Sequence, residues 1–335
     1  MSIKILKITM IFFCYILIFQ GCSEQNNNVE LKKAKLSIAY IVNPRLPQLS
    51  ESEIQQIIKK TSQLSLSRFS LQIEIESFET LSIQQWIDPY ITEIMADNRV
   101  KNYMLKAENG SKKPLYNGFL ESFRGMPLKE IIQAVKNQPN SQEIDLTQNK
   151  KEILWQLAEL HLDKLIKIKA IQLADGKSLL QDDFYNEYMV WDYILEHQHQ
   201  YDLVITNQLL ASAEAYYPTV HSSMRGGITS GFAGRSQGKL GGTVVITTYP
   251  FISQANFFKK ARGQSYNQQE IIEMIAFITL HEFGHLFKYS PHYYDHPSCV
   301  MRPTPGLFYK EWMIELKKKP RCNKQHDEVF RDYFN

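Results

Sequence analysis

One short motif near residue 280 combines two side chains that bind metals with one that moves protons. His281 and His285 stand four residues apart, and Glu282 follows the first of them. On a helix such histidines lie on one face, about 5–6 Å apart at Cβ, so both rings can reach one tetrahedral zinc ion. Glu282 projects from a different side of the helix, where it can take a proton from water without binding the metal. The spacing predicts zinc-dependent hydrolysis, with Glu282 catalytic and both histidines as metal ligands.

The segment before this motif predicts a buried helix. Residues 268–280 read QQEIIEMIAFITL and are apolar almost all round, which is typical of a helix enclosed by the protein. Two histidines and a glutamate at the end of a buried helix are costly unless partners or a metal satisfy them. Four of the nine histidines fall between residues 281 and 296, so further metal ligands are available nearby.

Several segments with the features of strands and helices surround the motif and predict an α/β domain over residues 35–335. Ser50 and Glu53 have the spacing of a capping box, and a helix with Ile54, Ile57 and Ile58 on one face should follow. This helix joins two predicted strands, and such a unit is expected to be parallel. We therefore expect a mixed, mainly parallel sheet. Its strands are predicted at residues 35–42, 69–78, 201–206 and 243–249.

Residues from about 80 to 200 predict a helical insertion in this domain. The clearest pattern is at 151–173, where leucines and isoleucines recur with helical spacing along one broad face. The insertion has no motif that indicates chemistry. Its other helices are expected near residues 83–96, 127–137 and 182–197.

The N-terminal residues predict export and a lipid anchor. Residues 1–21 begin with Lys4 and Lys7 and continue into an apolar run of signal-peptide length. Gly21-Cys22 after that run resembles the bacterial lipoprotein signal, which implies cleavage before Cys22 and acylation of its sulfur. Residues 22–34 would then form a polar tether to a bacterial membrane. The alternative is a membrane anchor that is never cleaved.

The overall charge gives no reason to expect a nucleic-acid partner. Lys and Arg number 38 and Asp and Glu 35, and the sequence has no long basic block. The composition, with 44% hydrophobic and 22% charged residues, is that of a globular protein and excludes a disordered or fibrous chain. The sequence gives no indication of oligomeric state.

The motif and the residues after it resemble a known family. His281-Glu282-x-x-His285, followed by Cys299-Val300-Met301, is similar to the metzincins and most similar to the archaemetzincins. The resemblance covers about residues 200–325. It implies a metzincin-like fold, one catalytic zinc, a peptide or protein substrate, and Met301 beneath the metal. It also implies that substrate pairs antiparallel with an edge strand near residues 226–230.

The chain departs from the family pattern H-E-x-x-H-x-x-G-x-x-H at two positions. Lys288 stands where the pattern has glycine, and Pro291 stands where it has the third histidine. His292 comes one residue later, and a turn longer by one residue would bring it to the same place. We therefore expect His292 as the third ligand, with His296 and Asp295 as alternatives.

Two other hypotheses remain open at this point. In a gluzincin arrangement, Glu311 or Glu315 on a later helix would be the third ligand. Alternatively, the chain is a lipid-anchored binding or scaffold protein that holds zinc without cleaving anything. An intact Glu282 favours catalysis, because a binding site alone has no need of that residue.

The cysteines have two possible roles. The family's second, structural zinc uses four cysteines, and this chain has only Cys299 and Cys322 in the region. His296 and His326 could complete a Cys2His2 substitute. Because an exported chain meets an oxidising compartment, we expect a disulfide between Cys299 and Cys322 instead.

Overall fold

The structure is a computed structural model. It describes residues 32–98, 100, 112–136, 141–173, 175–179, 183–197, 200–210, 231–235, 242–288, 298–304 and 307–318. Among these residues, no helix is both long enough and apolar enough to cross a bilayer. The predicted signal and Cys22 lie outside the described residues. The tether predicted over residues 22–34 is wrong at its end, because residues 32–34 pair with residues 71–73 and belong to the first strand of the sheet, with Ala34 buried.

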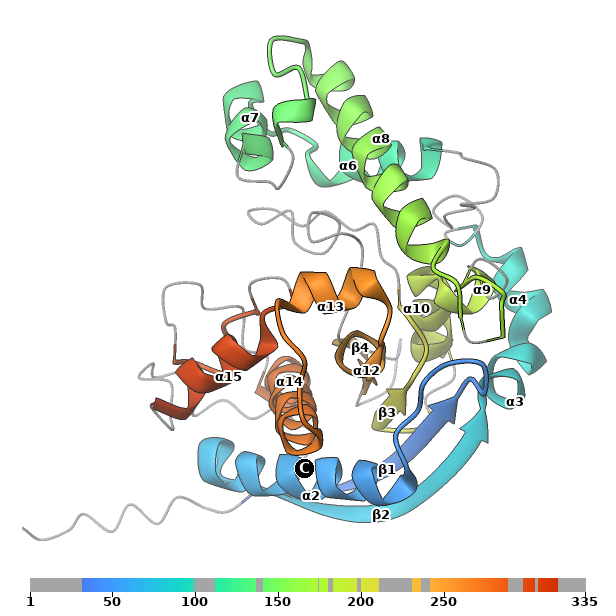
Figure 1. The fold of residues 1–335 in the computed structure, drawn as a ribbon, viewed down its shortest axis with the longest axis vertical. Helices are drawn as coiled ribbons and strands as arrows, with labels where there is room; N and C mark the ends of the chain where they lie inside the picture. The colour runs from blue at the N-terminus through green and yellow to red at the C-terminus, as the bar shows by residue number, and fades with distance from the viewer. Residues whose placement is uncertain are drawn as a thin grey trace, which may run out of the picture. The chain divides into compact units, whose positions relative to one another are not determined.

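The centre of the fold is a five-stranded sheet in the order β2-β1-β3-β5-β4. The first four strands in this order are parallel, and β4 pairs antiparallel with β5 at one edge. The predicted mixed, mainly parallel α/β sheet is therefore confirmed (Figure 1). The strands are β1 (Lys32–Val42), β2 (Leu71–Ser82), β3 (Leu203–Thr206), β4 (Gly231–Arg235) and β5 (Gly242–Thr247).

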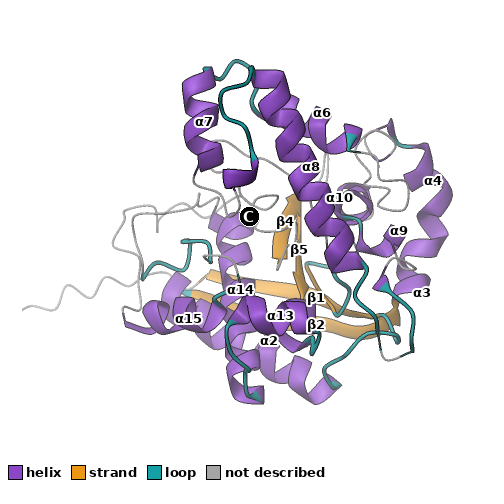
Figure 2. Ribbon diagram, turned by 45° about the horizontal axis from the view of Figure 1, so that its top comes forward, coloured by secondary structure: helices purple, strands orange, loops and turns teal. Residues whose placement is uncertain are grey.

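Alternation along the central strands divides the core into two layers. In β1, Leu36, Ile38 and Tyr40 enter one hydrophobic cluster, whereas Ala39 and Ile41 enter another. Successive residues of a strand point to opposite faces, so each cluster covers one face of the sheet. Helices α2 (Glu51–Phe69) and α14 (Gln268–Lys288) supply the first cluster, and helix α10 (Tyr188–His197) contributes to the second (Figure 2). Both faces are buried, as is usual for a parallel sheet.

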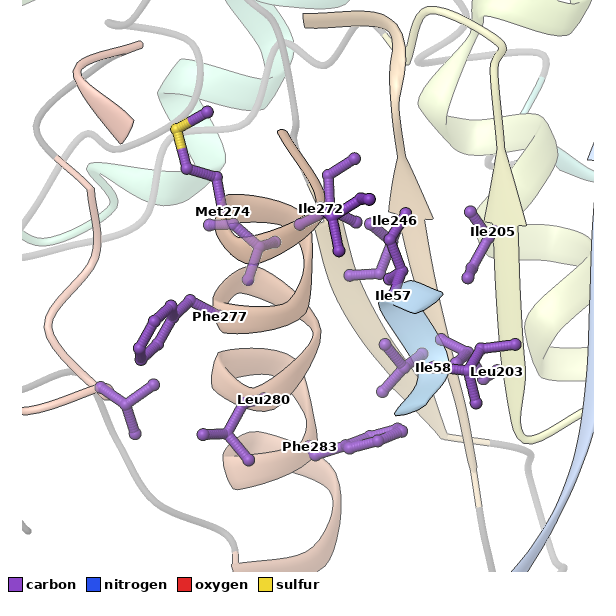
Figure 3. Packing of buried hydrophobic residues seen from close by; sticks show 14 of the residues in the cluster. Ile57, Ile58, Leu203, Ile205, Ile246, Ile272, Met274, Phe277, Leu280 and Phe283 are labelled. Carbon is purple, nitrogen blue, oxygen red and sulfur yellow. The ribbon is translucent and has the colours of Figure 1, made fainter. Parts of the chain in front are cut away.

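Helix α2 begins as predicted and holds α14 against the sheet. Ser50 and Glu53 form the capping box: the Glu53 amide donates to Ser50 Oγ at 3.3 Å, and the Ser50 amide donates to Glu53 Oε2 at 2.7 Å. Figure 3 shows isoleucines of α2 and the apolar side of α14 packed over residues of β3 and β5. The labelled side chains are Ile57, Ile58, Leu203, Ile205, Ile246, Ile272, Met274, Phe277, Leu280 and Phe283.

The predicted helical segment between β2 and β3 is present. Helices α6, α7 and α8 bury a cluster of their own around Phe119 and Leu157, separate from both layers of the sheet. Helices α3, α4 and α10 instead contribute to the second layer. The bounds are α3 (Ile83–Ile87), α4 (Ile91–Ala96), α6 (Lys113–Ser122), α7 (Leu128–Lys136), α8 (Lys150–Lys169) and α9 (Asp183–Asn186).

Three features differ from the sequence prediction. Strand β5 ends at Thr247, because a short helix α12 (Tyr249–Ile252), with a proline in its first turn, follows at once. Helix α13 (Asn256–Arg262) was not predicted, since its seven residues are too few to show periodicity. An edge strand was expected near residues 226–230, which lie outside the described residues, and the edge strand that the structure describes is β4, which begins just after them at Gly231.

Candidate metal centre

Helix α14 carries the motif on its last two turns. Asn267 caps its start: the Glu270 amide donates to Asn267 Oδ1 at 2.9 Å, and the Asn267 amide donates to Glu270 Oε2 at 3.0 Å. The helix then runs for 21 residues, about 31 Å, and ends at Lys288. The predicted buried helix is confirmed, with Met274, Phe277 and the residues between them buried.

His281 and His285 converge at their outer ring nitrogens. Their Nε2 atoms lie 3.2 Å apart. The Nδ1 atom of His281 lies 2.6 Å from the carbonyl oxygen of Val300. Because a carbonyl only accepts, Nδ1 of His281 must carry the proton, which leaves the Nε2 lone pair of the neutral ring as an acceptor. This is the tautomer that a metal bound at Nε2 requires.

The spacing of these nitrogens fits a zinc ion. Two nitrogens bound to one tetrahedral zinc, each at about 2.0–2.1 Å, lie roughly 3.3–3.4 Å apart. The separation of 3.2 Å between the two Nε2 atoms is close to that value. The same distance fits a hydrogen bond between the rings, so the spacing admits a metal without demanding one. His281 is 4% exposed and His285 is half-buried, which places the pair where a ligand can still reach it.

Glu282 lies beside the pair, under the edge strand of the sheet. Glu282 is 7% exposed. A Cβ atom built on Gly231, the first residue of β4, would lie 3.2 Å from Cγ of Glu282 and 2.7 Å from Cδ1 of Ile246. Any larger residue at this position would force Ile246 or Glu282 to move, so glycine allows the close approach of β4 to Glu282. The edge strand and the acidic side chain belong to the same site.

Burial also changes the protonation of Glu282 and predicts a pH-dependent stability. Desolvation raises the pKa of Glu282 from 4.5 to about 8. The folded protein keeps a proton that the unfolded chain loses between these values, so this stabilisation is complete below about pH 4.5 and is lost as the pH rises through 8. In metal-free protein, Glu282 should lower the free energy of unfolding by up to about 1.4 kcal/mol per pH unit in this window. Urea unfolding of wild type and Glu282→Gln across the window tests this, and parallel pH profiles would contradict it.

Met301 packs directly against the motif. A Cβ atom on Gly284 would lie 2.2 Å from Sδ of Met301 and 3.0 Å from its Cε. Met301 is buried, and it stands in a turn in which the Arg302 amide donates to the Cys299 carbonyl at 3.0 Å. We call these four residues, Cys299–Arg302, the 299–302 turn. The turn thus contacts α14 through both the Val300 carbonyl and the Met301 side chain.

Helix α15 (Tyr309–Lys318) presents an apolar face to this region, and its glutamates point elsewhere. Trp312 is buried, with its ring centroid 6.3 Å from that of His281. Glu311 accepts a hydrogen bond from Gln264 at 2.8 Å, and Glu315 pairs with Lys318 at 2.5 Å. The gluzincin alternative is not supported, because both glutamates bind other side chains. The residues of α15 that face inward recur with helical spacing and are apolar. They are Tyr309, Trp312, Met313 and Leu316.

Part of the predicted ligand set lies outside the described residues. This holds for His292, Asp295, His296, Cys322 and His326. Within the described ranges, no group of three or more histidine, cysteine or carboxylate side chains is placed to hold a metal. A third side-chain ligand for the histidine pair would therefore come from the rest of the chain.

Cys299 is disulfide-bonded, which agrees with the disulfide predicted at this cysteine. Its sulfur is thereby withdrawn from a second, structural zinc site, which needs thiolates. The pairing of Cys299 with Cys322 remains a prediction, since Cys322 is not among the described residues.

Three residues of the site could not be identified as site residues from the sequence. Gly231 stands among other glycines, and nothing distinguishes it as the one above Glu282. Val300 acts through its carbonyl, which every residue has. Trp312 belongs to a helix whose orientation only packing decides. The periodicity of α15 does predict that Trp312 is buried, but it does not predict its neighbour.

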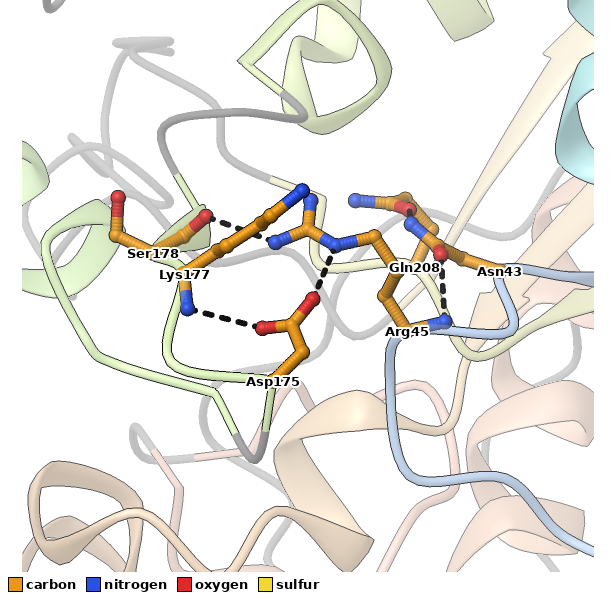
Figure 4. A network of polar contacts seen from close by, with 6 residues as sticks. All are labelled: Asn43, Arg45, Asp175, Lys177, Ser178 and Gln208. Carbon is orange, nitrogen blue, oxygen red and sulfur yellow. Dashed lines mark hydrogen bonds and ion pairs between the residues drawn. The ribbon is translucent and has the colours of Figure 1, made fainter.

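A second polar cluster, at the carboxyl ends of β1 and β3, connects segments of the fold. Ligand sites of α/β proteins often lie at such strand ends. Here Asn43 Nδ2 donates to Gln208 Oε1 at 2.9 Å, and Arg45 Nε donates to Asp175 at 2.8 Å (Figure 4). The Asn43 amide also donates to Asn207 Oδ1 at 2.7 Å. These groups satisfy one another and join the sheet to the segment around Asp175.

Comparison with known proteins gives one structural similarity. No family model and no curated protein sequence matches the chain. A solved structure that is similar is archaemetzincin from Methanopyrus kandleri, a crystal structure at 1.5 Å resolution. The alignment covers 88% of this chain and 92% of the other, with 12% sequence identity and a TM-score of 0.33. At that similarity the comparison does not bear on the function of this chain, which rests on the residues of α14 and their neighbours.

Proposed function

We propose that this protein is a zinc-dependent peptidase. The observation that carries the proposal is the convergence of the His281 and His285 Nε2 atoms at 3.2 Å, with buried Glu282 between them in the sequence and the edge strand β4 above it. The resemblance to metzincins in the motif and in Cys299-Val300-Met301 supports the same reading.

Each residue has a distinct role in this proposal. His281 and His285 would hold the metal, and the Val300 carbonyl keeps His281 in the required tautomer. When bound, zinc supplies Lewis-acid chemistry that polarises a carbonyl oxygen and makes water more acidic. Glu282 takes the proton from the attacking water and passes it to the leaving amine. A cation beside Glu282 also favours its carboxylate form, which a base requires.

The edge of the sheet is a suitable place for a peptide substrate. Strand β4 pairs with β5 on one side, and it is the last strand of the sheet that the described residues form. An extended peptide can add to such an edge through main-chain hydrogen bonds, which would bring its backbone next to Glu282. The segment first considered for this role, residues 226–230, lies just before β4 and outside the described residues.

Zinc content is the direct test of this proposal. We expect elemental analysis to find one zinc per chain in wild type and none in a His281→Ala, His285→Ala double variant. A double variant that keeps its zinc would show that the metal binds elsewhere. Wild type without zinc, even after incubation with it, would overturn the proposal. Zinc without hydrolysis of any peptide library would favour the alternative of a zinc-holding binding or scaffold protein.

We also propose that the chain is exported and anchored through a lipid on Cys22. The support is the sequence alone: a signal-like run followed by Gly21-Cys22. Cys22→Ser should move the protein from the membrane fraction to the soluble fraction or leave its signal uncleaved. Cys14→Ser is the matched control, because Cys14 lies in the segment expected to be removed. Intact-mass analysis that finds no acyl chain on wild type would contradict the proposal.

A further inference from the structure

We infer that the Cys299 disulfide positions the metal site, so that breaking it weakens metal binding. The inference rests on the proposed function and deepens it. The inference is argued from the 299–302 turn. Cys299 is covalently bound, the Val300 carbonyl accepts a hydrogen bond from His281 Nδ1, and the Met301 side chain fills the space beside Gly284.

The hydrogen bond between the Val300 carbonyl and His281 depends on the exact position of the turn. The Nδ1 atom lies 2.6 Å from the carbonyl oxygen, so a small shift of the turn breaks the hydrogen bond. Without this bond the ring can rotate or place its proton on Nε2, where the metal should bind. Loss of such a supporting contact typically lowers metal affinity about 10–100-fold.

The residues of the turn are held in different ways. At the end of the turn, the backbone carbonyl of Arg302 accepts a hydrogen bond from Trp312 Nε1 at 2.8 Å. Met301 is fixed by packing against Gly284. Cys299, at the start, is buried and covalently bound. The carbonyl that accepts from His281 belongs to the next residue, Val300, so a cross-link at Cys299 limits the movement of the backbone that carries this carbonyl.

The disulfide makes metal affinity sensitive to reduction. A dithiol reductant transfers two electrons and two protons, so that each sulfur becomes a thiol and the reductant closes into its own disulfide. Trp312 and Met301 still hold the turn, so the fold should persist while the carbonyl of Val300 gains freedom. We therefore expect a loss of affinity without unfolding.

The test measures zinc affinity by competition with a chromogenic chelator. It compares oxidised wild type, wild type reduced with dithiothreitol and then alkylated, and Cys299→Ser. The absorption spectrum of Co²⁺-substituted protein, which reports ligand geometry, is recorded for each. We expect the dissociation constant of the reduced protein and of the variant to rise about 10–100-fold, with an altered cobalt spectrum and unchanged far-UV circular dichroism.

A control variant separates positioning from general destabilisation. Leu157→Ala creates a cavity in the separate α6–α8 cluster and should lower stability without changing zinc affinity. If Cys299→Ser does not fold, reduction of folded wild type still decides the question. Equal affinities and spectra in the oxidised and reduced states would overturn the inference alone. Failure of oxidised wild type to bind zinc would instead overturn the proposed function.

Discussion

Replacing Glu282 by Gln should abolish peptide hydrolysis and leave the zinc content unchanged. The side chains have nearly the same shape, but an amide cannot accept the proton of the attacking water. Loss of a general base lowers the rate about 10²–10⁴-fold. The measurement is kcat/KM on a peptide that wild type cleaves, together with zinc per chain.

Glu273→Gln is the matched control for this variant. It makes the same substitution in the same helix, nine residues earlier and about 13 Å along the axis. Glu273 pairs with Lys317 and Lys60 at the surface, so its loss should leave activity intact. If both variants were as active as wild type, Glu282 would not be the base. If Glu282→Gln lost its zinc, its effect on rate could not be assigned to proton transfer.

Replacing Gly284 by Ala should destabilise the protein, although alanine is the better helix former. In an open helix the change stabilises by roughly 0.5–1 kcal/mol. Here the new Cβ would lie 2.2 Å from Sδ of Met301 and 3.3 Å from Cζ of Phe69. Met301 is 2% exposed, so the displaced side chain must disturb other core residues. Overpacking of this kind costs about 1–3 kcal/mol, and it should also weaken zinc binding by moving the 299–302 turn.

Two further variants make this result specific. Gly118→Ala, in helix α6, adds the same methyl group where nothing lies within 4 Å, and it should stabilise slightly. Combining Gly284→Ala with Met301→Ala removes the clash, so the second substitution should cost less there than it does in wild type. Denaturant unfolding of wild type, Gly284→Ala, Met301→Ala and the double variant gives the coupling free energy. A coupling near zero would show that Met301 does not occupy the space beside Gly284.

The local features of the chain could be predicted because short-range physics decides them. The capping box at Ser50 needs only residues three apart, and it forms as expected. The apolar run before His281 had to be buried, and it is. The two histidines share a helix face because their spacing is close to one helical turn, and their nitrogens do converge. In these cases neighbouring residues carry all the information.

Contacts between distant segments could not be predicted in this way. The pairing of His281 with the Val300 carbonyl spans 19 residues, and it depends on where the 299–302 turn packs. Gly231 meets Glu282 only because β4 joins the edge of the sheet beside β5. The glutamates of α15 have ligand-like spacing, yet burial of Trp312 and Leu316 turns them away. Burial of apolar area is non-directional, so the sequence predicts which residues become buried. Only the packed structure decides which of them meet.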